Sequence, residues 1–275
     1  DELRHSHFTA LQVKNAIIDL QRKIWNERSN INIKSPDICL HLHLYSKNAI
    51  LSLDTSANSL HKRGYRSAMG IAPLKENIAA GLLKLTNWDQ SSPLIDPLCG
   101  SGTFLLEAVS IARGVSPGIH RSFILQNWND FDKKVWEIEK IRAQNAFSPR
   151  KELPKIFGCE ENIDIANQAK ANILNAGFEK DITILNGHFR NCKFTESSGI
   201  IVCNPPYGKR IGKIQELESM YKELGAFLKE NASGWDLWIL NGNPSLSGLL
   251  GMKCCRRYPI SNGGIDCRWL HYEIH

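Results

Sequence analysis

Apolar positions recur with two different periods along this chain of 275 residues. In the segment 8–27 they return at roughly helical spacing, which predicts an amphipathic helix with Ser6 or Thr9 as its N-cap. In the segment 40–45, leucines alternate with histidine and tyrosine, which predicts a half-buried strand that turns at 46–48 into a second strand. One helix and two strands bury little core, so this first unit is expected to lack a piece or to pack on later parts of the chain.

From residue 94 onward the pattern changes to short apolar runs that alternate with helical segments, after a helix that begins near Pro73. Five runs have strand character: "LID", "IFGC", "ITIL", "IIVC" and "LWIL". Gly177 is the expected C-cap of one helix, the segment 114–150 is expected to be a helical insertion, and extended runs around Asn262 predict a final hairpin. This order predicts an α/β fold, a mostly parallel sheet with helices on both faces and a C-terminal antiparallel hairpin.

The composition is that of a globular protein, with 42% hydrophobic and 23% charged residues. No apolar run approaches the roughly 20 residues of a membrane span, and the polar N-terminus lacks the core of a signal peptide. The eight cysteines include no CxxC pair, which indicates reduced thiols in a cytoplasmic protein rather than a disulfide framework or a zinc site. We interpret the His-x-His pairs, His5/His7 and His41/His43, as solvent-facing residues rather than metal ligands, so the sequence predicts no metal.

Basic residues are concentrated at the beginning of the chain. The net charge is +6, and the segment 1–66 holds ten Lys and Arg against six Asp and Glu, so it contributes +4 of that total. A basic bias of this kind is compatible with a polyanionic partner such as RNA, although a solvated surface would show the same bias.

A glycine turn after the first parallel strand is the expected cofactor site, because ligands of open α/β sheets bind at the carboxyl ends of strands. In "DPLCGSGTF" the glycines allow a ligand to approach the backbone, and the following helix offers free N–H groups. No Gly-Lys-Ser/Thr follows, so the turn is not a P-loop. Asp96 would repel a pyrophosphate but attract an ammonium group. The candidate cofactor residues here are Asp96, Cys99, Gly100, Ser101, Gly102 and Thr103.

S-adenosylmethionine fits these requirements, because it is a nucleoside that carries an amino acid tail and no phosphate. Glu160, at the end of the next strand, is the expected acceptor for both ribose hydroxyls, with Glu161 as a substitute and a helix cap as the alternative role.

The segment "IVCNPPYG" ends a strand with two adjacent prolines, which cannot continue a central strand. The Asn204 amide oxygen and the Pro205 carbonyl could accept both hydrogens of a base amine and direct its nitrogen at a methyl donor. Pro206 would help to fix that carbonyl, and Tyr207 offers a ring on which an extruded base can stack. These four residues are the candidate catalytic residues.

The two motifs together resemble those of class I amino-methyltransferases that use S-adenosylmethionine. Several segments resemble, nearly end to end, the THUMP-domain family of bacterial 23S ribosomal RNA guanine-N2 methyltransferases: "SHFTALQVKNAI", "LSLDTSANSLHKRGYR", "APLKENIAAGLL", "DPLCGSGTFLLEA", "NPPYGKRIG" and "NGGIDCRWLHYEI". The resemblance implies a Rossmann-like catalytic domain of seven strands over 67–275 and a partial THUMP-like RNA-binding segment over 1–66. It also implies methylation of guanine N2 in 23S rRNA or a large-subunit precursor.

One position departs from the family pattern. The family usually places an Asp after the third strand to contact the adenine amino group, whereas this chain has Gly187 and His188. Neutral His188 could accept that hydrogen bond, or a backbone carbonyl could. The same motifs also serve N6-adenine methylation of DNA or RNA and glutamine methylation of proteins, and a non-catalytic RNA-binding assembly factor is a third alternative.

Overall fold

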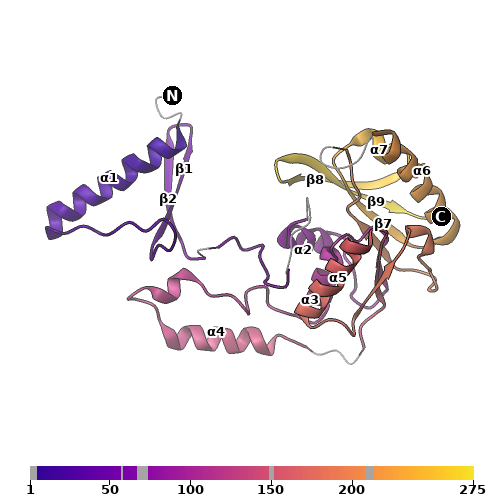
Figure 1. Cartoon of the computed structure of the whole chain (residues 1–275), viewed down its shortest axis with the longest axis horizontal. Coiled ribbons are helices and arrows are strands. Elements are labelled where there is room, and N and C mark those ends of the chain that lie inside the picture. Colours follow the sequence, from indigo (N-terminus) through magenta and orange to yellow (C-terminus); the bar gives the residue numbers. More distant parts are fainter. Residues whose placement is uncertain (1–4, 57, 67–73, 149–151, 209–213) are drawn as a thin grey trace. The chain divides into compact units, whose positions relative to one another are not determined.

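The computed structural model describes residues 5–56, 58–66, 74–148, 152–208 and 214–275. The chain divides into two compact units (Figure 1). The N-terminal unit comprises residues 1–59 and 122–134, and the sheet unit comprises residues 60–121 and 135–275. The expected start of a helix near Pro73 lies outside the described residues.

The N-terminal unit contains the predicted helix and hairpin: α1 (Ser6–Trp25), β1 (Cys39–Tyr45) and β2 (Asn48–Asp54), with β1 and β2 antiparallel. The predicted N-cap was wrong, because the His5 side chain caps α1 by accepting from the Phe8 N–H at 3.2 Å. The expected half-burial of the first strand is also not seen, since Leu40 and Leu44 are both 42% exposed. A two-stranded ribbon and one helix provide too few layers to cover both leucines.

The sheet unit is built on a mixed seven-stranded sheet in the order β5-β4-β3-β6-β7-β9-β8. Its strands are β3 (Leu94–Asp96), β4 (Ile156–Glu160), β5 (Ile182–Asn186), β6 (Ile200–Cys203), β7 (Asp236–Asn241), β8 (Cys254–Asn262) and β9 (Ile265–Glu273). The first five are parallel, and β9 runs antiparallel to both β7 and β8. This arrangement confirms the predicted α/β fold and its C-terminal hairpin.

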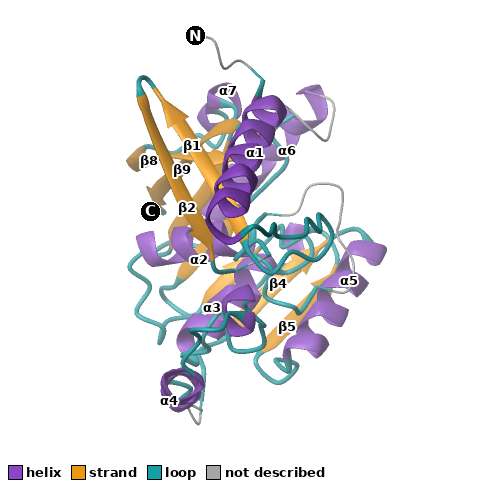
Figure 2. Cartoon of the chain, turned by 90° about the vertical axis from the view of Figure 1, so that its left-hand side faces the viewer, coloured by secondary structure: helices purple, strands orange, loops and turns teal. Residues whose placement is uncertain are grey.

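Five helices and a 3-10 turn join and cover these strands: α2 (Glu76–Leu85), α3 (Thr103–Ala112), α5 (Ile163–Ala176), α6 (Ile214–Asn231), α7 (Pro244–Gly248) and η2 (Phe189–Asn191). The 3-10 turn η1 (Ile124–Asn127) and the helix α4 (Lys133–Asn145) lie in the segment between α3 and β4. Figure 2 shows α5 beside β4 and β5, the strands with which it packs. Gly177 ends α5 with a φ of 72°, which confirms the predicted C-cap. Among the described residues, no helix combines the length and the apolar character that crossing a bilayer requires.

The core of the sheet unit lies between the strands and their helices. Trp269 stacks on Phe104 and on Trp238, with ring centroids 5.5 and 5.8 Å apart, and all three side chains are buried. Because these aromatic residues come from α3, β7 and β9, the C-terminal hairpin and α3 share one core. The carboxyl ends of the parallel strands are thereby held at one fixed edge.

The predicted insertion is helical, but part of it belongs to the other unit. Residues 122–134, including η1, group with the N-terminal unit, where the Trp128 Nε1–H donates to the Asp37 carbonyl at 2.8 Å and the Leu125 N–H donates to the Thr55 carbonyl at 3.4 Å. These long-range contacts could not be predicted from the sequence, because Trp128 lies in a polar segment without periodicity.

Candidate active site

The two motifs follow neighbouring strands. β3 pairs with β6 in parallel, with Leu94 opposite Ile200 and Ile95 opposite Ile201. Asp96 ends β3, and Asn204 directly follows β6. Both residues therefore lie at the carboxyl edge of the sheet on adjacent strands, where open α/β sheets bind ligands.

Asp96 is a buried carboxylate with one described hydrogen-bond partner. The residue is 2% exposed, and its Oδ1 accepts from the Leu98 N–H at 3.1 Å. Burial raises the pKa of Asp96 well above its usual range, and the nearby Glu160 carboxylate adds to that increase. A buried, ionised carboxylate needs a compensating charge, so this position favours a cationic ligand group.

The glycine turn and Glu160 are in direct contact. The Gly100 N–H donates to Glu160 Oε2 at 3.1 Å, and the Asn162 N–H donates to Oε1 at 2.9 Å. Gly100 and Gly102 have φ angles of 53° and 82°, in the left-handed region where a β-carbon is strained. The turn therefore needs glycine at both positions, and Glu160 is anchored to it rather than acting only as a cap of α5.

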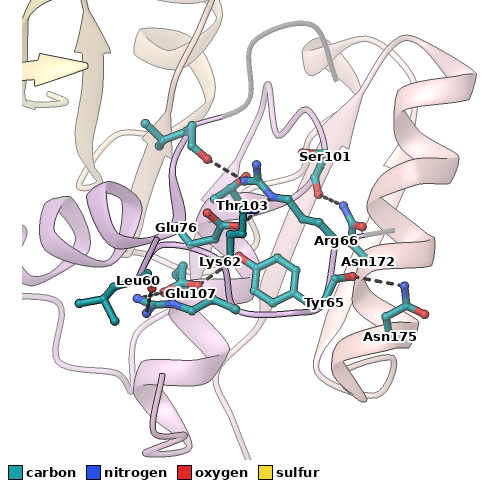
Figure 3. Close-up of polar contacts among 12 residues, drawn as sticks. Leu60, Lys62, Tyr65, Arg66, Glu76, Ser101, Thr103, Glu107, Asn172 and Asn175 are labelled. Atoms are coloured by element: carbon teal, nitrogen blue, oxygen red, sulfur yellow. Dashed lines mark hydrogen bonds and ion pairs between the residues drawn. The ribbon is translucent and has the colours of Figure 1, made fainter. Parts of the chain in front are cut away.

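Protein groups contact the other candidate residues of the glycine turn. The Cys99 side chain is buried, and the Ser101 carbonyl accepts from Asn172 Nδ2 at 3.1 Å. Thr103 begins α3, and its Oγ1 accepts from Arg66 Nη2 at 2.7 Å, as Figure 3 shows. The Thr103 hydroxyl is thus engaged by the segment that precedes the sheet, while the backbone N–H groups at the start of α3 give this end of the helix its positive character.

Asn204 presents an acceptor without a described partner. Its Oδ1 is buried and has no hydrogen-bond partner among the residues that the structure describes. A buried polar atom of this kind costs free energy unless it is satisfied, so it is a candidate ligand contact. Pro205 is buried and Pro206 is half-buried.

Tyr207 is 8% exposed, and its hydroxyl accepts from Asn262 Nδ2 at 3.4 Å. Its ring packs against Gly242, since a β-carbon built at Gly242 would lie 2.9 Å from ring carbons. The stacking role of Tyr207 stays a prediction. Sequence reasoning missed Asn262 and Gly242, because Asn262 was interpreted only as part of a turn and the glycine follows a strand without a motif.

His188 lies after β5 as expected, but its ring nitrogens face protein groups. Its Nδ1 accepts from the Arg190 N–H at 3.4 Å, and its Nε2 lies 3.5 Å from Glu223 Oε1. Its backbone carbonyl accepts from Cys159 Sγ at 3.3 Å. A contact between His188 and an adenine stays a prediction, and in this geometry it would require the ring to leave Glu223.

A buried polar network that the sequence did not predict lies beside the glycine turn (Figure 3). The Tyr65 hydroxyl donates to Glu107 Oε1 at 3.1 Å, and Arg63 Nη2 lies 3.4 Å from Glu107 Oε2. Arg66 Nε lies 3.2 Å from Glu76 Oε1. Burial raises the pKa of Glu107, and the positive charge of Arg63 partly opposes this increase. The network attaches residues 60–66 to α2 and α3.

The comparisons with known proteins agree with this geometry. Residues 63–271 match the family model UPF0020, described as an RMKL-like methyltransferase domain, and residues 2–54 match a THUMP domain. The chain is 39% identical over 275 residues to "Putative RNA methyltransferase slr0064" of Synechocystis, and covers 71% of that protein. It is 36% identical to "Ribosomal RNA large subunit methyltransferase K/L" of Syntrophotalea carbinolica, but spans only 40% of its length.

A solved structure shows the same fold. The crystal structure of "SMU.472, a putative methyltransferase complexed with SAH" aligns with 97% of this chain and 70% of its own, with a TM-score of 0.85 and 26% identity. The family match extends over more than half of the chain and includes both motifs. The chain belongs to the UPF0020 family of RMKL-like methyltransferase domains, with a THUMP domain before the methyltransferase domain.

Proposed function

We propose that this chain transfers a methyl group from S-adenosylmethionine to the exocyclic N2 of a guanine in 23S ribosomal RNA. The observation that carries the proposal is the buried Asn204 Oδ1, which has no hydrogen-bond partner among the described residues. Asn204 directly follows β6, the neighbour of β3, and the glycine turn follows β3. An amide oxygen at this position can accept an N–H from the exocyclic amine of a base.

The glycine turn fits the cofactor. The buried Asp96 carboxylate would pair with the ammonium group of the amino acid tail, and Glu160, which is anchored at the turn by the Gly100 N–H, would accept from the ribose hydroxyls. When bound, S-adenosylmethionine supplies an electrophilic methyl group on a sulfonium. A crystal structure related to this chain contains the corresponding product, SAH.

The chain's own residues would position the base. Asn204 Oδ1 and the Pro205 carbonyl accept the two N2 hydrogens, so the nitrogen lone pair is directed at the methyl carbon. N2 would gain the methyl group as the carbon–sulfur bond of the cofactor breaks, and N2 would then lose one proton to water. No general base is required before transfer, because the nitrogen becomes acidic as it is alkylated.

The RNA assignment is supported by charge as well as by the relatives' names. An open cavity of about 970 Å³ lies beside the end of β7 and is lined by Lys253, Arg257 and Arg268 against a single carboxylate, Asp266. Gly242, which contacts the Tyr207 ring, also lines this cavity. Arg268 pairs with Asn241 at the carboxyl end of β7, and it and the other cations of this cavity can bind phosphates that flank an extruded base.

The test uses labelled S-adenosylmethionine and ribosomal RNA that lacks its modifications, followed by digestion and identification of the labelled nucleoside. The full chain should produce N2-methylguanosine, and Asn204→Ala should reduce turnover about 10²–10³-fold, as removal of one positioned hydrogen-bonding group does in other enzymes. Asn231→Ala is the matched control, because that amide is exposed on α6.

A different labelled product would contradict the proposed substrate. Labelled N6-methyladenosine or labelled protein glutamine would keep the chemistry and change the substrate. If no nucleic acid or protein is labelled, with naked RNA or with a large-subunit precursor, the binding-only alternative is favoured and the proposed activity is wrong.

A further inference from the structure

Three metal-ligating side chains meet at the edge of the sheet opposite the active site. Cys255, His271 and Glu273 each offer a ligand atom, and these atoms all lie within 4.8 Å of one another. Glu273 pairs with Asp236 at the amino end of β7, whereas the candidate active site lies at the carboxyl end of the parallel strands. The three side chains, called here the Cys-His-Glu cluster, are therefore separate from the methyl-transfer site.

A β-bulge places the cysteine in this cluster. Cys254 pairs with Tyr272 and Arg256 pairs with His271, so Cys255 is the extra residue in β8. Bulges redirect a side chain that regular alternation would place elsewhere. His271 and Glu273 are two residues apart in β9, so their side chains project from the same face of the sheet.

One ring nitrogen of His271 contacts a carboxylate, and the other has no described hydrogen-bond partner. Its Nε2 lies 2.7 Å from Asp236 Oδ1, and its ring stacks on Trp238 with centroids 4.3 Å apart and an interplanar angle of 13°. With the Nε2 proton donated to the carboxylate, the lone pair is on Nδ1. Nδ1 is buried and has no hydrogen-bond partner among the described residues, and His271 is only 7% exposed. A carboxylate behind a histidine is the usual outer contact of a metal-bound imidazole.

We infer that the Cys-His-Glu cluster binds a divalent transition metal, with zinc as the ion that best fits its ligands. Thiolate sulfur, imidazole nitrogen and carboxylate oxygen are the three donor types that zinc accepts. Binding releases the thiol proton of Cys255, and the zinc–sulfur, zinc–nitrogen and zinc–oxygen bonds form without a change in oxidation state. Water or the exposed His275, whose Nε2 lies 3.9 Å from Glu273 Oε2, can fill the fourth position.

The metal would fasten an edge strand. β8 is the last strand of the sheet, and it pairs only with β9 among the described strands. A bond from Cys255 in β8 to His271 and Glu273 in β9 would cross-link the hairpin close to the bulge, where the ladder is interrupted. We therefore expect the ion to stabilise the fold and not to act in methyl transfer.

The test is calorimetric titration of the full chain with Zn²⁺ after treatment with a chelator. We expect one site that is lost in Cys255→Ser and kept in Cys254→Ser, the matched control with the neighbouring thiol. His7→Gln and His43→Gln account for binding by the two exposed His-x-His pairs. Both cysteines are at least partly exposed, so the serine variants should fold. Equal zinc binding by the chain and by Cys255→Ser, or none by either, would overturn the inference.

A second measurement separates a metal site from a simple histidine–aspartate pair. Co²⁺ should give a thiolate-to-cobalt absorption band in the chain and in Asp236→Asn, and no band in Cys255→Ser. Asp236→Asn should weaken Zn²⁺ binding about 10–100-fold, because it removes the outer contact of His271. A band that persists without Cys255 would contradict the assignment. Neither measurement depends on the proposed methyltransferase activity.

Discussion

Replacing Asp96 by Asn should weaken cofactor binding while it stabilises the protein without cofactor. The asparagine Oδ1 can still accept from the Leu98 N–H, which Asp96 receives at 3.1 Å, so the turn keeps its shape. The variant loses only the negative charge. A hydrogen bond to a charged group contributes about 1.5–3 kcal/mol, so S-adenosylmethionine should bind about 10- to 150-fold more weakly.

Without cofactor, Asp96→Asn should raise the free energy of unfolding, because Asp96 is buried. Burial raises the pKa of Asp96, so the folded chain keeps a proton at pH values where the unfolded chain has lost it. The contribution of Asp96 to the free energy of unfolding therefore falls as pH rises from the ordinary carboxyl range through the raised pKa. Asp96→Asn removes this decrease, so the variant should be the more stable protein at neutral pH.

Two assays test the expected effects of Asp96→Asn on cofactor affinity and on stability. Calorimetry measures the affinity for S-adenosylmethionine, which should rise with pH in the wild type because the ionised carboxylate is the binding form, and should not do so in the variant. Denaturant unfolding at several pH values measures the stability. Asp19→Asn, at an exposed position of α1, is the control. Unchanged affinity in Asp96→Asn would refute the ammonium assignment, and lower stability at neutral pH would refute the argument from burial.

Three further changes test the surroundings of the site. Tyr65→Phe should lower the free energy of unfolding by about 1–3 kcal/mol in denaturant unfolding, because Glu107 loses a buried donor. Gly158→Ala should cost about 1–3 kcal/mol in the same assay and weaken S-adenosylmethionine binding, since its β-carbon would lie 2.5 Å from Leu105 Cδ1 and displace the packing under the glycine turn. Arg257→Ala should weaken RNA binding and reduce its salt dependence by about one unit of slope in a filter-binding titration.

Matched controls make these results specific. Tyr45→Phe changes an exposed tyrosine, and Gly248→Ala adds a β-carbon where no atom lies within 4 Å. Lys180→Ala removes an exposed cation away from the cavity. Unfolding of Tyr65→Phe at the wild-type denaturant concentration, or RNA binding by Arg257→Ala with the wild-type salt slope, would contradict the corresponding reasoning.

The architecture of the sheet unit was predictable because strong local signals agreed with it. Short runs such as Ile200–Cys203 are buried on both faces and therefore continuously apolar, and Gly177 ends α5 where the sequence predicts a C-cap. The N-terminal unit was harder to predict in detail. Its strands form, but the alternation of leucines did not predict burial, because burial depends on a covering layer that a period of two does not reveal.

The sequence motifs of the candidate site could be predicted, but the contacts between its residues could not. Glycine turns and a double proline are local signals, so Gly100 and Asn204 could be found from the sequence. The hydrogen bond from Gly100 to Glu160, the packing of Tyr207 on Gly242 and the pairing of His188 with Glu223 all join residues far apart in the chain. Such contacts depend on the order of strands, which no single segment encodes.

Glu107 shows what kind of signal could have revealed one of these contacts. It is the one charged residue of α3, in the helix "TFLLEAVSIA", where every neighbour within a turn on either side is apolar or small. A buried carboxylate is stable only with donors or cations around it. The segment Lys62–Arg66 is the basic run that enters the sheet unit, and it supplies Arg63 and Tyr65 to Glu107 and Arg66 to Thr103. An isolated charge in an apolar helix therefore indicates a partner elsewhere in the chain, and here the partners Arg63 and Tyr65 connect the chain entering the sheet unit to α3, the helix that would bind the cofactor.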